Sequence, residues 1–142
     1  MASKKTTKIK KGGYSQRPLK DKLGIKDSAS IAILEAPPYY ASLVGIENFD
    51  TELDLDSYDF LHFFTSSALG LGHVFPVLAK RLKPAGMLWI SWPEQSANVE
   101  TDVSENVVRE IGVANGLVDV KVAAIDETWS GLKFVYRLKD RK

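Results

Sequence analysis

Few side chains in this chain of 142 residues could do chemistry. It has no cysteine, which excludes thiol nucleophiles, disulfides, Cys-ligated zinc and iron–sulfur clusters. Its two histidines, His62 and His73, are too few for a histidine-rich metal site, and no Ser-His-Asp order or deaminase signature can be assembled around them. We therefore predict no metal site and no cofactor from these residue types.

Three smaller groupings admit both a chemical and a structural interpretation. Asp102 and Glu105 could act as paired acid and base, but Asp102-Val103-Ser104-Glu105 also has the form of a helix capping box, and we favour the cap. His62 lies in an apolar run, which favours a hydrogen-bonded core histidine over a general base or a ligand. Gly70-Leu71-Gly72 lacks the Lys-Ser/Thr of a phosphate loop and is interpreted as a loop feature.

Short apolar runs and the turn residues beside them predict the elements that would position these side chains. The expected strands are Ile31 to Leu34, an edge strand at Thr51 to Leu55, Tyr58 to Phe64, Met87 to Trp92, and a hairpin of Val118 to Ile125 and Leu132 to Leu138 around a turn at Asp126 to Gly131. The expected helices are Pro18 to Gly24, Tyr39 to Ile46, about His73 to Leu82, and one from the capping box to Asn115-Gly116. In the third of these, Pro76 would lie in the first turn and Lys83 to Gly86 would end the helix. This alternation predicts a three-layer α/β fold whose mostly parallel, Rossmann-like sheet ends in an antiparallel hairpin strand.

Charge is distributed unevenly along the chain. The formal net charge is +1, yet the first 13 residues hold five lysines (Lys4, Lys5, Lys8, Lys10 and Lys11) and no acid. Their low apolar content predicts a disordered basic tail over residues 1 to 13, before a single domain spanning residues 14 to 142. That domain is mildly acidic, so nucleic acid is expected as a partner only through the tail. On the hairpin, Lys121 and Lys133 would face each other or solvent.

The sequence offers no membrane or export segment. The basic start is followed by no apolar segment, so no secretory signal is expected. Phe60 to Ala79 lacks Asp, Glu, Lys and Arg, but its polar residues, glycines and proline are unsuited to a lipid-facing helix. We expect a cytoplasmic protein without a membrane partner.

Residues that follow the expected strands form a candidate binding rim, because parallel α/β sheets bind ligands at the carboxyl ends of their strands. These residues are Glu35, Thr65, Trp92, Glu94, Asp126, Glu127, Trp129 and Ser130. Two tryptophans among several carboxylates would suit a basic or aromatic ligand, through ring stacking and ion pairing. In the alternative interpretation both rings are structural, with Trp92 in the core and Trp129 packed under its own hairpin.

Several of these segments resemble known families. The LKPAG turn before a strand, followed by a terminal hairpin, resembles class I methyltransferases, in which a Leu-Lys-Pro-Gly-Gly turn precedes the fifth strand. More closely, LKDKLGIK, EAP, LKPAGMLWISWP and GLVDVKVAAIDETWSGLKFVYR resemble the DUF3052 family of small bacterial proteins of unknown function, over Leu19 to Arg137. The resemblance implies a bacterial protein of Rossmann-like fold without an established activity. The chain departs from the family at Glu94, where a basic residue often follows the Trp-Pro pair.

A methyltransferase-like fold implies a glycine-rich turn after the first strand, where the backbone approaches a nucleoside cofactor. Here that turn is Glu35-Ala36-Pro37-Pro38-Tyr39, which has no glycine and whose prolines remove two N–H donors. The segment before Tyr58 is also too short for the two strand–helix units that such enzymes place there. We therefore expect a degenerate, non-enzymatic methyltransferase-like domain that binds a small molecule or a protein partner at the rim. The alternative is a methyltransferase or other nucleotide-ligand enzyme with an atypical cofactor site.

Overall fold

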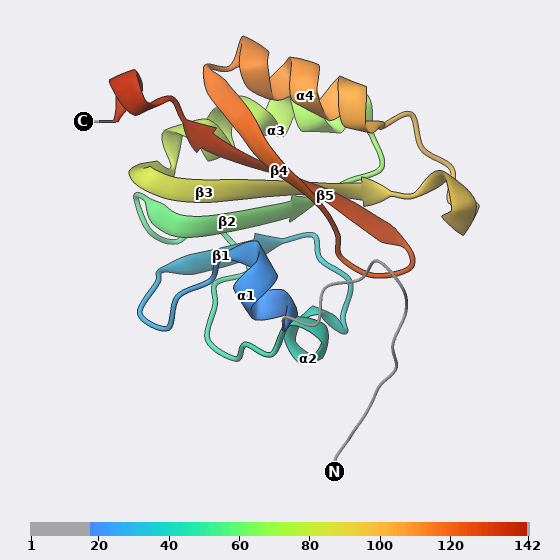
Figure 1. Cartoon of the computed structure of the whole chain (residues 1–142), viewed down its shortest axis with the longest axis horizontal. Coiled ribbons are helices and arrows are strands. Elements are labelled where there is room, and N and C mark those ends of the chain that lie inside the picture. Colours follow the sequence, from blue (N-terminus) through green and yellow to red (C-terminus); the bar gives the residue numbers. More distant parts are fainter. Residues whose placement is uncertain (1–17, 142) are drawn as a thin grey trace.

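The computed structural model describes residues 18–141, which form one five-stranded sheet with helices on both faces (Figure 1). The strands are β1 (Ile31–Leu34), β2 (Tyr58–Phe64), β3 (Leu82–Pro93), β4 (Leu117–Ala124) and β5 (Trp129–Tyr136). They lie in the order β1-β2-β3-β5-β4. β1, β2 and β3 run parallel, and β5 is antiparallel to both of its neighbours, which confirms the predicted fold. The predicted tail of residues 1 to 13 lies outside the described residues.

The helices are divided between the two faces of the sheet. α3 (Ala68–Lys80) and α4 (Glu105–Ala114) cover one face, and the short α1 (Leu19–Leu23) and α2 (Tyr40–Val44) cover part of the other (Figure 1). Two further single turns are η1 (Gln95–Ala97) and η2 (Leu138–Asp140). β2 is apolar on both faces because its side chains enter the two cores alternately: Leu61 packs under α3 and Phe60 packs toward α1 and α2. None of the helices described is long and apolar enough to span a membrane.

The third parallel strand is longer than its apolar run predicted. Lys83 to Gly86 were expected to close a helix, but they belong to β3, which begins at Leu82 beside Tyr58. The register with β2 then shifts before Phe60 pairs with Met87, and Pro84 lies within this irregular stretch, where a missing N–H donor is tolerated. A long-range strand pairing therefore overrides the local turn signal.

The helix after β2 begins earlier than predicted. The Ser67 side chain caps it by accepting a hydrogen bond from Gly70 N, so α3 starts at Ala68 and Pro76 lies in its interior. Gly70 and Gly72 are consequently helical, which corrects their interpretation as a loop. Pro76 has no N–H to donate to the carbonyl of Gly72, four residues earlier, so one hydrogen bond of the helix is missing there.

The predicted edge strand at Thr51 to Leu55 is absent from the described sheet, and only Asp50 makes a single bridge to β1, at Ala32. Side chains, and not a neighbouring strand, form hydrogen bonds with the backbone groups of this segment. The Tyr58 hydroxyl accepts from the amides of Asp54 and Leu55, at 2.9 and 3.0 Å, and Arg81 donates to the carbonyl of Leu55 at 2.7 Å.

The predicted capping box before α4 is wrong in its cap residue. Ser104 is the cap and accepts from Val107 N at 3.3 Å, while Asp102 accepts from the amide of Ala68 at 2.8 Å, at the start of α3. Asp102 therefore joins two helix starts instead of capping its own helix. In α4 itself, Glu105 forms an ion pair with Arg109 at 2.6 Å.

Candidate functional site

The carboxyl ends of β1, β2 and β3 lie at one edge of the sheet, together with the turn at residues 125–128 that joins β4 to β5 (Figure 1). We call this the carboxyl edge. All eight predicted rim residues lie along it, as the parallel topology requires. The sheet nevertheless separates most of them into distinct groups, because neighbouring residues of a strand point to opposite faces.

The first group lines a hollow of about 450 Å³ between the end of β3 and the start of α4. Its walls include Trp92, Glu94, Asp102, Glu105, Val122 and Ser130, and we call it the acidic hollow. The Ser130 hydroxyl donates to Glu94 Oε1 at 2.5 Å, which joins the end of β3 to β5. Trp92 is only 5% exposed and packs in the core, so its ring forms an apolar floor and cannot lie flat against a ligand.

Charge in the acidic hollow is predominantly negative. Of the described residues that line it, Glu94, Asp102 and Glu105 are acidic and none is basic. Arg109, behind the start of α4, pairs with Glu105 and with Asp119 on β4, at 2.6 and 2.9 Å. Within residues 18–141, the two other carboxylates have only uncharged donors: a hydroxyl for Glu94 and a backbone amide for Asp102. An organic cation is therefore the ligand that this hollow suits electrostatically.

The second group lies on the opposite face, around the turn between β4 and β5. Asp126 Oδ1 accepts from the amides of Thr128 and Trp129, both at 2.8 Å, while its Oδ2 accepts from the Tyr39 hydroxyl at 2.7 Å. Burial, followed by the bond to Asp126, raises the pKa of Tyr39, and a hydrogen bond with the Trp129 side chain opposes that rise. Asp126 is thus a structural link between the turn and α2. Glu127, beside it, is exposed.

Trp129 lies in β5 opposite Pro93, and not in the turn where the sequence analysis placed it. Its half-buried ring meets Phe64 edge-on, with centroids 5.0 Å apart and an interplanar angle of 82°. Because this ring packs on the α1 and α2 face while Trp92 packs on the other, the two tryptophans do not form one stacking surface. Both rings make the packing contacts that the structural interpretation predicts.

Substituting Trp129→Ala is therefore expected to lower the free energy of unfolding by about 2 kcal/mol, below the cost for a fully buried aromatic because the ring is only half-buried. Thermal melting measures this loss. Tyr39→Phe, which keeps the neighbouring ring and removes only its hydroxyl, serves as the milder control. A Trp129→Ala variant with a near-native melting curve would contradict the packing role.

The third group surrounds the turn after β1. Glu35 is exposed and has a positive φ of 58°, a left-handed conformation that usually belongs to glycine. It borders a hollow of about 280 Å³ whose walls include Pro37, Pro38, Tyr40 and Phe49. Within this turn, the amide of Tyr40 already donates to the carbonyl of Pro37 at 3.0 Å. Few amides remain that could approach a phosphate or a carboxylate.

Thr65 belongs to none of these groups. Its hydroxyl accepts from the amide of Ser67 at 3.1 Å, and its own amide donates to the carbonyl of Ser91 at 3.0 Å. Thr65 therefore shapes the entry to α3.

Three hydrogen-bonded polar side chains lie in a row on the face of the sheet beneath α2, and only the middle one was predicted from the sequence. His62 is fully buried, with Nδ1 2.8 Å from the Tyr40 hydroxyl and Nε2 2.8 Å from Ser91 Oγ. The prediction of a hydrogen-bonded core histidine is confirmed. Burial lowers the pKa of His62 to about 3 and raises that of Tyr40. A serine inside the apolar strand Met87 to Trp92 was the signal for one of the missed partners.

Within residues 18–141, no three His, Asp or Glu side chains converge as ligands for a metal ion.

The sequence matches no protein-family model. A search of curated proteins gives no match either. Solved structures of similar fold include a methyltransferase that depends on S-adenosylmethionine, from Aquifex aeolicus, at 15% identity and a TM-score of 0.57, covering 80% of this chain and 85% of that one. Ribosomal protein L11 methylase from Lactobacillus delbrueckii subsp. bulgaricus has 14% identity and a TM-score of 0.54, with 83% and 74% covered. Precorrin-6y C5,15-methyltransferase from Geobacter metallireducens has 12% identity and a TM-score of 0.55, with 84% and 86% covered. At these identities the likeness shows the fold alone, which is the Rossmann-like fold of class I methyltransferases.

Proposed function

We propose that this chain is a non-enzymatic, methyltransferase-like domain that binds a small organic cation, or the basic side chain of a protein partner, in the acidic hollow. The observation that carries the proposal is the combination of three carboxylates, no basic lining residue and an apolar Trp92 floor in a hollow of about 450 Å³. Membership of the DUF3052 family, a bacterial source and a cytoplasmic location are further parts of the proposal, and they rest on sequence patterns.

The turn after β1 supports the loss of the usual cofactor site. Its two prolines have no N–H to donate, and the amide of Tyr40 is already bonded to Pro37. Beside β1, the described segment makes only the bridge at Asp50, whose carboxylate accepts from the Tyr58 hydroxyl at 2.5 Å. A nucleoside would therefore find few unpaired amides and no second strand with an acid at its end.

Calorimetric titration with S-adenosylmethionine, S-adenosylhomocysteine and common nucleotides tests the first half of the proposal. We expect no measurable heat of binding, because the turn lacks the donors that such ligands need. Micromolar binding of S-adenosylmethionine would contradict the proposal and support the alternative of an enzyme with an atypical cofactor site.

Titration with spermidine, used as a probe of organic cations, tests the second half. The Glu94→Gln substitution keeps the hydrogen-bond acceptor for Ser130 but removes the charge, so we expect it to weaken spermidine binding about tenfold. Glu127→Gln is the matched control, since Glu127 lies on the same edge but does not line the hollow. No spermidine binding, or equal weakening by both substitutions, would contradict a specific site in the acidic hollow.

A further inference from the structure

We propose that a second hollow, at the opposite edge of the sheet, binds the carboxylate of a small organic acid between Lys26 and Lys133. This hollow lies where β1, β2 and β3 begin, so it is separate from the acidic hollow and independent of the proposed function. Its volume is about 250 Å³, which suits an acid of a few carbon atoms or a single ring. We call it the amino-edge hollow.

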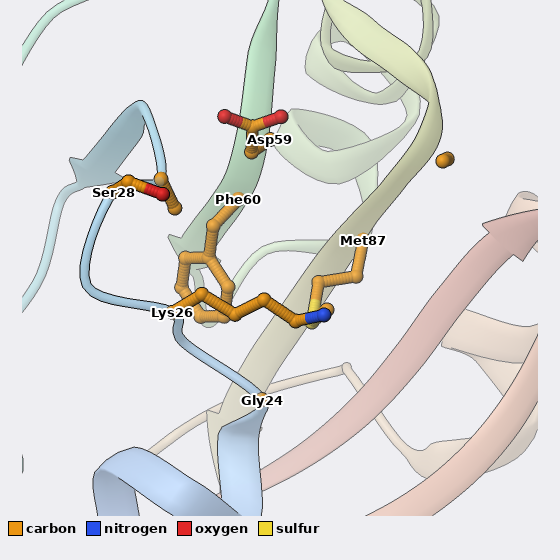
Figure 2. A pocket seen from close by; sticks show the side chains of 8 residues that line it. Gly24, Lys26, Ser28, Asp59, Phe60 and Met87 are labelled. Atoms are coloured by element: carbon orange, nitrogen blue, oxygen red, sulfur yellow. The ribbon is translucent and has the colours of Figure 1, made fainter.

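Its walls come from three parts of the chain. The loop between α1 and β1 contributes Gly24, Lys26, Ser28 and Ala29, while the start of β2 contributes Asp59 and Phe60, and β3 contributes Ala85 and Met87. Figure 2 shows the Lys26 side chain extending from its loop across the hollow in the direction of Met87. The hollow is thus lined both by a lysine and by apolar side chains.

Asp59, the acidic residue that lines the hollow, already has other hydrogen-bond and ion-pair partners. Asp59 Oδ2 accepts from the amide and the hydroxyl of Ser30, at 2.8 and 3.0 Å, and Lys83 Nζ lies 3.4 Å from Oδ1. These contacts, the Ser30 backbone bond first, hold the pKa of Asp59 below its usual value. Among the described residues, the Lys26 ammonium has no hydrogen bond or ion pair, so its charge is not neutralised by Asp59.

Lys133 supplies a second cation without an acidic partner in the described part of the chain. Its Nζ lies 3.8 Å from the point that a Cβ on Gly24 would occupy, and Met87 Sδ lies 3.0 Å from the same point. Lys133 does not itself line the amino-edge hollow, but Gly24 and Met87 both do, so the Lys133 ammonium lies next to two residues of its wall.

The position of Lys133 is electrostatically unfavourable in the absence of an anion. The side chain is half-buried and stands opposite Lys121 across β4 and β5. Burial, followed by the charge of Lys121, lowers the pKa of Lys133. Lys121 itself donates to the carbonyl of Lys22 at 2.7 Å. A bound anion would offset this repulsion, which like charges at opposite positions of a sheet create.

The apolar walls favour a carboxylate with a hydrocarbon body over an inorganic anion. Phe60 is 1% exposed and closes the hollow, with Met87 and two alanines beside it, while the exposed Ser28 hydroxyl offers one further donor. An anion such as phosphate would use the lysines but leave the apolar wall without a contact. The geometry therefore points to a small aliphatic or aromatic acid.

Benzoate, with the neutral isostere benzamide as control, is the probe for this site. We expect benzoate to shift the amide NMR signals of residues 24–29 and 85–87 of the full chain, and benzamide to leave them unchanged. Lys133→Gln and Lys26→Gln should each weaken benzoate binding about tenfold, since each removes a charge-assisted hydrogen bond. Lys133→Arg keeps the charge and should retain binding, and Lys139→Gln, at an exposed position in η2, should have no effect.

The Lys133→Gln variant also reports on stability. Since Lys133 has no acidic partner among the described residues and faces Lys121, Lys133→Gln should melt at the same temperature as the parent protein or higher. Phosphate that shifts the same amides as strongly as benzoate would overturn the assignment of a hydrocarbon-bearing acid. Absence of benzoate shifts at residues 24–29, or equal shifts by benzamide, would overturn the site itself.

Discussion

Lowering the pH from 7 to 5 is expected to reduce the free energy of unfolding by about 2 kcal/mol through His62 alone. The pKa of His62 is about 3 in the folded protein, against 6.5 for an ordinary histidine. Below pH 6.5, His62 therefore binds a proton in the unfolded chain but stays neutral in the folded chain. The loss begins as the pH falls through 6.5 and continues until the pH reaches the folded value, where it amounts to about 5 kcal/mol.

The low pKa of His62 has a structural cause. A neutral imidazole has one donor and one acceptor nitrogen, and the hydroxyls of Tyr40 at Nδ1 and Ser91 at Nε2 can satisfy both, because each hydroxyl can donate or accept. A second proton would have to be placed on the accepting nitrogen, against the hydroxyl that donates to it. Because His62 is fully buried and its hydrogen-bond partners are two hydroxyls, an imidazolium would have neither solvent nor a carboxylate of the described residues to stabilise it.

Chemical denaturation as a function of pH measures this effect. In His62→Gln the part of the pH dependence between pH 6.5 and 4 should disappear, whatever the stability of the variant at neutral pH. His73→Gln is the matched control, because His73 is exposed on α3 and its removal should leave the pH profile unchanged. A parent protein of constant stability from pH 7 to 5 would refute the assignment of a neutral, buried His62.

Gly112→Ala is expected to lower the free energy of unfolding by about 3 kcal/mol, although alanine is the better helix former. A Cβ on Gly112 would lie 2.1 Å from Cε1 of Phe134, on β5 beneath α4. The Phe134 ring cannot move aside easily, because Phe75 of α3 packs against it edge-on with centroids 5.3 Å apart. Overpacking therefore outweighs the gain in helix propensity.

A glycine on the neighbouring helix provides the opposite result for comparison. Nothing lies within 4 Å of a Cβ built on Gly72 of α3, so Gly72→Ala should raise the stability by up to about 1 kcal/mol. Denaturant unfolding of the two variants should give shifts of opposite sign. The double variant Gly112→Ala with Phe134→Leu should recover part of the loss. If Gly112→Ala is neutral, the close packing of α4 on β5 is incorrect.

Local patterns determined the elements whose signals are complete within a few residues. Ile31 to Leu34 is a continuous apolar run, and Tyr58 to Phe64 is apolar except at Asp59 and His62; both form strands with the predicted bounds, because a strand buried on both faces needs apolar residues at most positions. The glycine stop after Leu23 is of the same kind, since Gly24 takes the left-handed conformation that ends a helix. The order of these elements was enough to predict the class of fold.

Elements whose signals depend on distant partners were predicted incorrectly. β3 begins at Leu82 because Tyr58, 24 positions earlier, pairs with it, and no property of Lys83 to Gly86 indicates that pairing. Asp102 has the sequence context of a helix cap, yet it bonds to Ala68 on another helix. Such contacts are specified by packing of whole elements, which a window of neighbouring residues does not contain.

The candidate site shows the same division. By itself the sequence determined that acidic and aromatic residues gather at the carboxyl edge, because parallel strands must end on the same side of a sheet. Only the tertiary structure decided which of them meet: Glu94 bonds to Ser130, while Asp126 bonds to Tyr39 on the other face. Only the fold, likewise, brought Lys133 close to Gly24. The physical reason is that strand periodicity assigns a residue to a face, but partners on that face come from segments far apart in the chain.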